Sequence, residues 1–290
     1  MNKNISLSYV VNVSVLAILP SSVWAFGMLG GNGVMLQSNQ NVQVGVEFQK
    51  IENAGFAFDA TSANFDATVY GNGSARVPEN VSSLTSEVLL IRGDYAVSNG
   101  INLFGKVGTT KDKGNLLRSN PGNLVAVGAR YVPVQDSLIK VGLSLQGMYV
   151  GEKGARDSVP ANATPTYANT SIYNARGNAQ DKLQYQRYDA LLNVSFDTRY
   201  VTPYLGILFT YINGEYSSKV EGNATANTCT PTCSSTSTHF IYTENRKVSN
   251  PNLIGAIFGI SLNQNEQFGF NLETRFGQGF AYVGSAVARF

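Results

Sequence analysis

The side chains best suited to acid–base chemistry in this sequence centre on its single histidine. His239 stands in the run Thr236-Ser237-Thr238-His239-Phe240, five residues before Glu244. A histidine with a hydroxyl or carboxylate partner can serve as general acid or base in hydrolysis. The local motifs of known hydrolases are missing around it, so a solvated loop histidine is the favoured interpretation. We therefore expect that the protein is not an enzyme, and an enzyme acting through His239 is the alternative.

The N-terminus has the pattern of an export signal. Lys3 supplies a positive charge, residues 5–19 form a mostly apolar run, Pro20 ends it, and Val23-Trp24-Ala25 fits a cleavage site. The apolar run is shorter than the ~20 residues that a spanning helix needs. We expect residues 1–25 to be a signal peptide, followed by a Gly-rich segment over 26–40 and a β-barrel over 41–290.

Cys229 and Cys233 enclose the stretch Thr230-Pro231-Thr232. Because an exported chain crosses an oxidising compartment, we expect these cysteines to form a disulfide that shapes the tip of a loop. The chain-entropy model gives so small a ring only about 2 kcal/mol. Two thiols without a third ligand at a fixed spacing fall short of a usual metal site, and no cofactor is expected.

Composition excludes several classes of protein. Charged residues make up 14% of the chain, against the ~25% that is usual in soluble domains. A net charge of +2 is too small to indicate nucleic acid as a partner. Neither a G-x-x-x-x-G-K-[ST] loop nor an H-E-x-x-H pair occurs.

Apolar and polar residues alternate with a period of two in ten segments, which predicts ten β-strands. Asn252–Leu262 is apolar on both faces, so the orientation of that strand stays open. The segments are Asn41–Lys50, Glu87–Val97, Ile101–Val107, Asn123–Val132, Leu138–Val150, Arg187–Phe196, Arg199–Ile212, Asn252–Leu262, Phe268–Phe276 and Phe280–Phe290.

Short and long connections alternate between these strands. The connections at 98–100, 133–137, 197–198 and 263–267 are short, whereas those at 51–86, 110–122, 151–182 and 213–251 are long and rich in Ser, Thr, Asn and Gly. Only 277–279 is a short turn on the long-loop side. Short periplasmic turns, long extracellular loops and an even strand number are typical of a transmembrane barrel. We expect the long loops to lack regular structure of their own and to be functional or disordered.

Two features indicate that the apolar face of the strands points toward lipid. The other face carries charged and amide side chains unsuited to a dry core. A soluble or secreted barrel or sandwich is the alternative. Aromatic residues on the apolar face lie near the strand ends and form two girdles around an aliphatic band. These aromatics are Tyr95, Tyr131, Phe196, Phe268 and Phe290 at the short-turn end, and Phe48, Tyr149, Tyr188, Tyr211, Phe276 and Phe280 at the long-loop end.

The chain ends on Phe290, and a terminal aromatic on an alternating last strand resembles the C-terminal assembly signal of bacterial outer-membrane barrels. The mature chain resembles small barrels of the general OmpA, OmpX and OmpW type in its signal peptide, strands and girdles. The resemblance implies an all-β, transmembrane, antiparallel up-and-down β-barrel of about ten strands, with eight to twelve open. It places the protein in the outer membrane of a Gram-negative bacterium, with lipid and the barrel assembly machinery as partners.

The polar face is expected to line the barrel interior. A ten-stranded barrel is only slightly wider than an eight-stranded one, which side chains fill. Opposite charges are therefore expected to pair as a plug, and a narrow conduit with weak anion preference is the alternative. The charged residues assigned to this face are Glu47, Arg92, Asp94, Lys106, Arg130, Lys140, Arg187, Asp189, Glu273 and Arg275.

Together these patterns predict a non-enzymatic outer-membrane barrel with a structural or surface-interaction role, or a narrow passive pore. Its long loops would contact an extracellular ligand or a host surface. A porin-like diffusion channel for small solutes is one alternative, and an outer-membrane enzyme using His239 is the other. The fold by itself does not decide among them.

Overall fold

The computed structural model describes residues 42–67, 71–77, 80–98, 100–114, 120–135, 138–154, 166–167, 170–196, 198, 201–229, 232–263, 268–277 and 279–290. No helix in these ranges is long and apolar enough to cross a membrane. The expected signal peptide (1–25) and Gly-rich segment (26–40) lie outside the described residues, so both stay predictions.

The described residues form fourteen β-strands that pair antiparallel in one sheet. They are β1 (Val42–Phe58), β2 (Thr61–Ala67), β3 (Gly71–Val77), β4 (Asn80–Ser98), β5 (Ile101–Gly114), β6 (Gly122–Gln135), β7 (Ile139–Gly154), β8 (Thr166–Tyr167), β9 (Thr170–Phe196), β10 (Val201–Cys229), β11 (Cys233–Ser249), β12 (Ile254–Asn263), β13 (Phe268–Phe276) and β14 (Phe280–Arg289).

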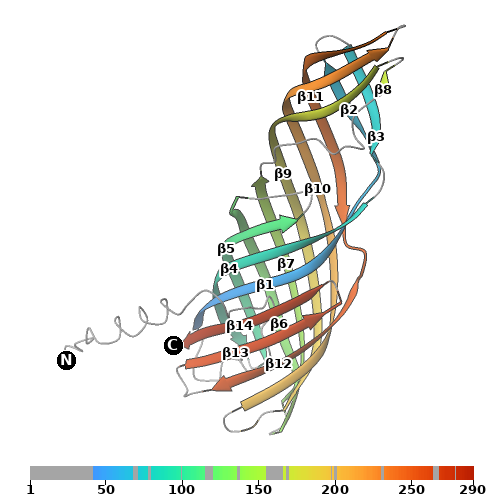
Figure 1. Cartoon of the computed structure of the whole chain (residues 1–290). Helices are drawn as coiled ribbons and strands as arrows, with labels where there is room; N and C mark the ends of the chain where they lie inside the picture. The colour runs from blue at the N-terminus through green and yellow to red at the C-terminus, as the bar shows by residue number, and fades with distance from the viewer. Residues whose placement is uncertain are drawn as a thin grey trace, which may run out of the picture.

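Ten of these strands close into a ring at the lower end of the molecule in Figure 1. The order around the ring is β1-β4-β5-β6-β7-β9-β10-β12-β13-β14, and β14 pairs back with β1. Each ring strand corresponds to one of the ten segments predicted from alternation. The prediction of an antiparallel up-and-down barrel of ten strands is confirmed.

The C-terminal residue takes part in closing the ring. Arg289 on β14 is the register partner of Gln43 on β1, and the Phe290 amide donates a hydrogen bond to the Val42 carbonyl at 2.9 Å. The Phe290 side chain is exposed on the outer face. The role of Phe290 as an assembly signal stays a prediction. Its backbone lies where the last strand, β14, pairs with the first, β1.

The outer face of the ring is apolar, as alternation predicts. Aliphatic side chains such as Val127, Leu143 and Ile207 are exposed there. Nine of the eleven girdle aromatics are exposed, whereas Phe48 and Phe280 are half-buried. Burying so much exposed aliphatic surface in lipid accounts for this face, because water would disfavour it. We call this belt of outward apolar residues the apolar band.

The structure also gives β12 its orientation, which alternation left open. Ile254 and Phe258 are exposed on the outer face, while Ile257 and Ser261 are buried inside. On the inner face Ile257 belongs to a cluster of buried hydrophobic residues, although its register partner on β13 is Arg275.

The expectation of long irregular loops is wrong for much of 51–86, 151–182 and 213–251. β9 and β10 run far past the girdle residues Tyr188 and Tyr211, and β10 returns as β11, with every residue of 213–229 in register with that strand. β2 and β3 add to the edge of β11. We call 170–186, 212–229, β11, β2 and β3 the extension; it rises from one side of the ring in Figure 1.

The hydrophobic pattern inverts where β10 leaves the apolar band. Up to Tyr211 the outward residues are apolar, for example Ile207 and Phe209. Beyond it, the apolar residues Ile212, Tyr216 and Val220 are buried on the inner face. The strand itself continues without a change of register with β9 through this point. Such an inversion is expected where one continuous strand passes from lipid to water.

The hydrophobic pattern also inverts along β1, where a β-bulge causes the change. The pairing of β1 with β4 shifts register between Ile51 and Ala54, and Asn53 has a positive φ of 55°. Asparagine tolerates this left-handed conformation better than most residues. The extra residue changes which positions point inward, so that Phe56 and Phe58 are buried after the bulge.

Candidate functional site inside the barrel

The structure places the ten predicted interior charges on the inner face of the ring. Lys140 is half-buried, and the other nine side chains are at most 8% exposed. Three opposite-charge pairs lie two residues apart on one strand, because residues i and i+2 point to the same face. They are Arg92–Asp94 on β4, Arg187–Asp189 on β9 and Glu273–Arg275 on β13.

A first ionic cluster joins β1, β4 and β5. Lys106 Nζ lies 2.7 Å from Glu47 Oε2, and Arg92 Nη1 lies 3.9 Å from the same oxygen. The Phe104 ring lies 4.6 Å from the Arg92 guanidinium carbon and 5.3 Å from Lys106 Nζ. The ring is the register partner of Gly128, where a Cβ would come within 2.3 Å of it. Glycine on β6 therefore lets the aromatic ring support both cations.

A second ionic cluster joins β7, β9 and β10. Arg187 Nε donates to Asp189 Oδ1 at 2.9 Å. Thr210 Oγ1 donates to the same oxygen at 2.7 Å, and Gln146 Nε2 donates to Asp189 Oδ2 at 3.3 Å. With three donors on one carboxylate, the charge of Asp189 is well compensated in spite of its burial.

A third cluster depends on a tyrosine that the sequence did not single out. Tyr204 donates to Glu273 Oε2 at 2.7 Å and lies 3.0 Å from Asn271 Oδ1, and Arg275 Nε donates to Glu273 Oε1 at 2.5 Å. The tyrosine reaches across β12 because its register partner there is Gly259, whose missing Cβ would lie 2.3 Å from the ring. The sequence contains both an inward tyrosine and an inward glycine. That they face each other can be recognised only once the register of β10 and β12 is known.

An apolar layer lies inside the molecule where the ring meets the extension. Phe56 packs edge-to-face on Tyr185 at 5.4 Å, and Phe58 packs likewise on Tyr216 at 5.7 Å. The expectation of a polar interior is therefore wrong for this level, because strands beyond the apolar band bury apolar side chains inward. The layer also includes Leu84, Leu124, Val150, Leu183, Ile212 and Val248.

Asp112 and Glu152 form a buried acidic pair that the sequence analysis did not identify. Asp112 lies beyond the apolar band, since its neighbours Lys111 and Lys113 are exposed on the outer face. Burial raises the pKa of Asp112 to about 6, and hydrogen bonding with Ser86 and Glu152 opposes that rise. The pair lay in or next to segments that the sequence predicted as loops, where no inward face could be assigned.

His239 is not brought to Glu244. Its side chain is 48% exposed and its Nε2 lies 3.7 Å from Glu221 Oε1 on β10, whereas Glu244 is buried on the opposite face of β11. His239 and Glu244 are therefore close in the sequence but do not form a pair in the fold. Among the described residues, no group of three His, Cys, Asp or Glu side chains could hold a metal ion.

The two cysteines are register partners at the end of the β10–β11 hairpin. Their side chains lie outside the described part of the structure, so the disulfide between Cys229 and Cys233 stays a prediction. Their placement at a hairpin end agrees with the expected position at the tip of a connection.

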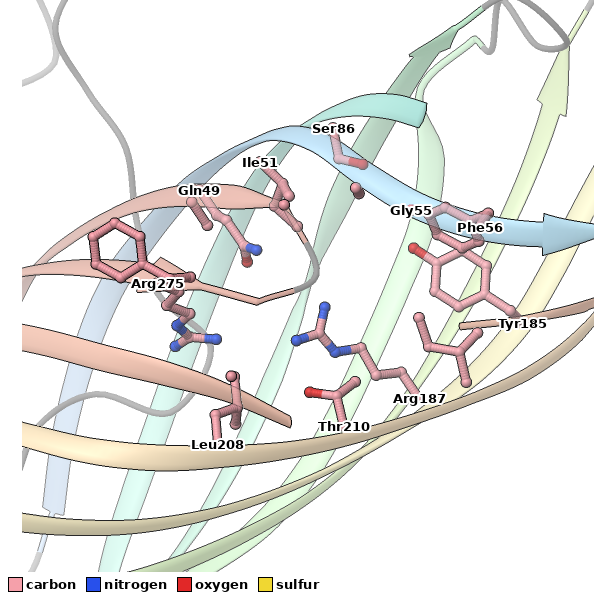
Figure 2. Close-up of a pocket in the computed structure, with 16 residues that line it drawn as sticks. Gln49, Ile51, Gly55, Phe56, Ser86, Tyr185, Arg187, Leu208, Thr210 and Arg275 are labelled. Atoms are coloured by element: carbon pink, nitrogen blue, oxygen red, sulfur yellow. The ribbon is translucent and has the colours of Figure 1, made fainter. Parts of the chain in front are cut away.

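A small cavity of about 40 Å³ lies between the ionic clusters and the apolar layer. Arg187 and Arg275 enter it from β9 and β13, and Figure 2 shows their guanidinium groups pointing toward one another. Gln49 and Thr210 lie beside them, and Tyr185 borders the cavity on the side of the apolar layer.

Comparison with known proteins identifies the fold and no family. No protein-family model matches the chain, and no curated protein matches it in sequence. Similar solved structures include the outer membrane protease OmpT from Escherichia coli (TM-score 0.47, 8% identity, 89% of this chain and 99% of that one). The translocator domain of the autotransporter NalP from Neisseria meningitidis is also similar (TM-score 0.42, 7% identity, 89% and 91% covered). The CymD monoaromatic hydrocarbon channel has a TM-score of 0.30 at 10% identity, with 88% and 89% covered.

These similar structures are outer-membrane β-barrels, and they assign this chain to no particular subfamily. They also contradict the expectation that the protein is not an enzyme, since OmpT, with a similar barrel, is a protease. That expectation rested only on the absence of local motifs around His239.

Proposed function

We propose that the protein is an outer-membrane barrel that presents its extension at the cell surface as a binding surface, while its interior is closed to solutes. The inversion of the hydrophobic pattern at Tyr211 and Ile212 carries this proposal. Below that point β10 suits lipid on its outer face, and above it the same face suits water. The extension is thereby a folded sheet outside the membrane.

The packing of the interior supports a closed barrel. Arg130, Lys106 and Tyr204 are among the large side chains that are almost fully buried inside the ring. Above them the apolar layer lines the interior with side chains that disfavour the passage of ions from one end of the barrel to the other. This arrangement favours the ion-paired plug over the narrow conduit with weak anion preference.

The outer face of the extension supports a binding role. A groove of about 440 Å³ is lined by Lys182 and Gln184 on β9, Glu215 on β10 and Lys247 on β11. Both signs of charge and an amide lie along it. Such a surface suits a polar partner, such as a charged peptide segment or a glycan, better than an apolar one.

Cysteine labelling tests the orientation on which the proposal depends. In a chain with Cys229→Ser and Cys233→Ser, we expect His239→Cys to react with a membrane-impermeant maleimide on intact cells. The matched variant Thr198→Cys, exposed at a short turn, should react only after the outer membrane is permeabilised. The reverse result would place the extension in the periplasm and remove the surface role.

Conductance and adhesion test the two halves of the function separately. Refolded protein in planar bilayers should give no discrete conductance steps, whereas regular steps would favour the diffusion channel. Replacing 219–243 by an Asn-Gly turn should remove attachment of cells to host surfaces and leave the barrel folded, because the flanking residues Ser218 and Glu244 are register partners. Unchanged attachment would contradict the binding role.

A further inference from the structure

The cavity between Arg187 and Arg275 has an unusual set of charges. Two guanidinium groups line it, and none of the described residues around it is acidic. In Figure 2 the two groups point toward one another from β9 and β13. Like charges that face the same cavity away from water repel each other. An anion between them would convert that repulsion into two attractions.

Both arginines keep their terminal nitrogens available to the cavity. Arg187 and Arg275 each engage a carboxylate through Nε, at 2.9 Å and 2.5 Å. The Arg275 side chain is only 5% exposed, and its Nη1 and Nη2 have no hydrogen-bond partner in the described part of the structure. A buried N–H without a partner costs free energy, so these donors are directed at a position that an acceptor would stabilise.

The nearby carboxylates are occupied elsewhere. Asp189 accepts hydrogen bonds from Thr210 and Gln146 as well as from Arg187, and Glu273 accepts one from Tyr204. Neither carboxylate lines the cavity. The carboxylate that balances each arginine therefore lies outside the lining of the cavity.

We propose that this cavity is a binding site for a small oxyanion or carboxylate. The paired N–H groups of a guanidinium match the two oxygens of such an ion, and charge-assisted hydrogen bonds of this kind are strong. A cavity of about 40 Å³ has room for about three water-sized positions. Formate, nitrate and bicarbonate have that size, whereas citrate is too large. The site is independent of the surface role proposed for the extension.

Thermal unfolding of refolded protein in detergent tests the proposal, with the heat-modifiable gel band as readout. At constant ionic strength, sodium formate and sodium nitrate should raise the midpoint by about 2–4 °C at roughly five times the dissociation constant. Sodium citrate should not raise it. Equal shifts with formate and citrate would indicate general screening and overturn the site.

Two arginine variants localise the effect. Arg275→Gln should abolish the response to formate, whereas Arg92→Gln should keep it. Arg92 is the matched control because it is also buried and paired with a carboxylate two residues away, but it does not line the cavity. A formate response that survives Arg275→Gln would overturn the proposal.

A measurement on the unchanged protein covers the case in which Arg275→Gln fails to fold. Crystals of the native chain soaked in sodium bromide should show an anomalous peak between the two guanidinium groups. Bromide serves here as a small anionic probe for the oxyanion position. Bromide peaks elsewhere on the molecule with none in this cavity would contradict the site.

Discussion

The ring and the extension share the strands β9 and β10 but have opposite hydrophobic patterns. On β9, the even-numbered residues Tyr188 and Leu192 face lipid, while the even-numbered Lys182 faces water. Direction, register and alternation are the same on both sides of the boundary. The comparison shows that period-two alternation determines the strand, and that the identity of the surrounding solvent determines which face is apolar.

The largest test of this contrast places a charge on the inner face of the extension. Val220→Lys buries an ammonium group at a position that is 0% exposed, and we expect a loss of about 3–5 kcal/mol in stability of the extension. Proteolysis of the refolded protein should then cut the extension while the barrel keeps its heat-modifiable mobility. Lys219→Leu, one residue away on the outer face, should change little. Similar damage from both would mean that the inversion is assigned wrongly.

The reciprocal test places a charge on the outer face of the ring. Ile207→Lys puts a cation in the apolar band and should cost about 2–4 kcal/mol. Glu215→Lys lies on the same face of the same strand, eight residues further along, and should be tolerated because that position faces water. The measurement is the folded fraction in lipid vesicles. If Glu215→Lys is as harmful as Ile207→Lys, the apolar band extends further than the structure indicates.

A smaller effect concerns the acidic pair where the two regions meet. The pKa of Asp112 is raised to about 6 from 3.8, so the folded state holds a proton that the unfolded chain has released in this window. Stability should therefore fall as pH rises from about 4 to 6. Asp112→Asn should stabilise the protein at pH 7.5, on the order of 1–3 kcal/mol, and have little effect at pH 3.5. Urea unfolding midpoints at the two pH values check this, and equal effects at both would contradict it.

The smallest effect is expected on the outer face of the extension. His239 and Glu221 are about half exposed, and exposed ion pairs of this kind contribute about 0–1 kcal/mol. His239→Ala should leave the unfolding midpoint almost unchanged, in contrast to Val220→Lys on the neighbouring strand. A loss as large as that of Val220→Lys would show that this face is also buried, against a partner or a second copy.

The sequence predicted the ring well because its outer face repeats one kind of residue. Leu205, Ile207, Phe209 and Tyr211 make the alternation on β10 unmistakable. The continuation of the same strand was missed because Gly214, Ser218 and Gly222 interrupt its inward apolar positions, and its outward residues are typical of loops. On β1 the bulge at Asn53 shifts the alternation by one residue, which hides Phe56 and Phe58 from a period-two search.

The interior was predictable as a set of side chains and not as a set of contacts. Alternation assigned Glu47 and Lys106 to the inner face, but they are 59 residues apart, and only the register of β1, β4 and β5 brings them together. The pairs at i and i+2, such as Arg187–Asp189, could have been predicted from the sequence alone. The cavity could not have been predicted from the sequence, because it depends on which hydrogen-bond donors stay without an acceptor after those ion pairs have formed.

The continuous pairing of β9 with β10 gives the molecule a mechanical property. From Ser195 opposite Tyr204 to Thr170 opposite Thr228, one ladder joins the barrel wall to the far end of the extension, with a single shift at Asn223. A partner that pulls the tip along the strand direction loads the hydrogen bonds of this ladder together, in shear, rather than opening them one after another. The strands that bear this load also form the barrel wall, so tension at the tip passes directly into the wall.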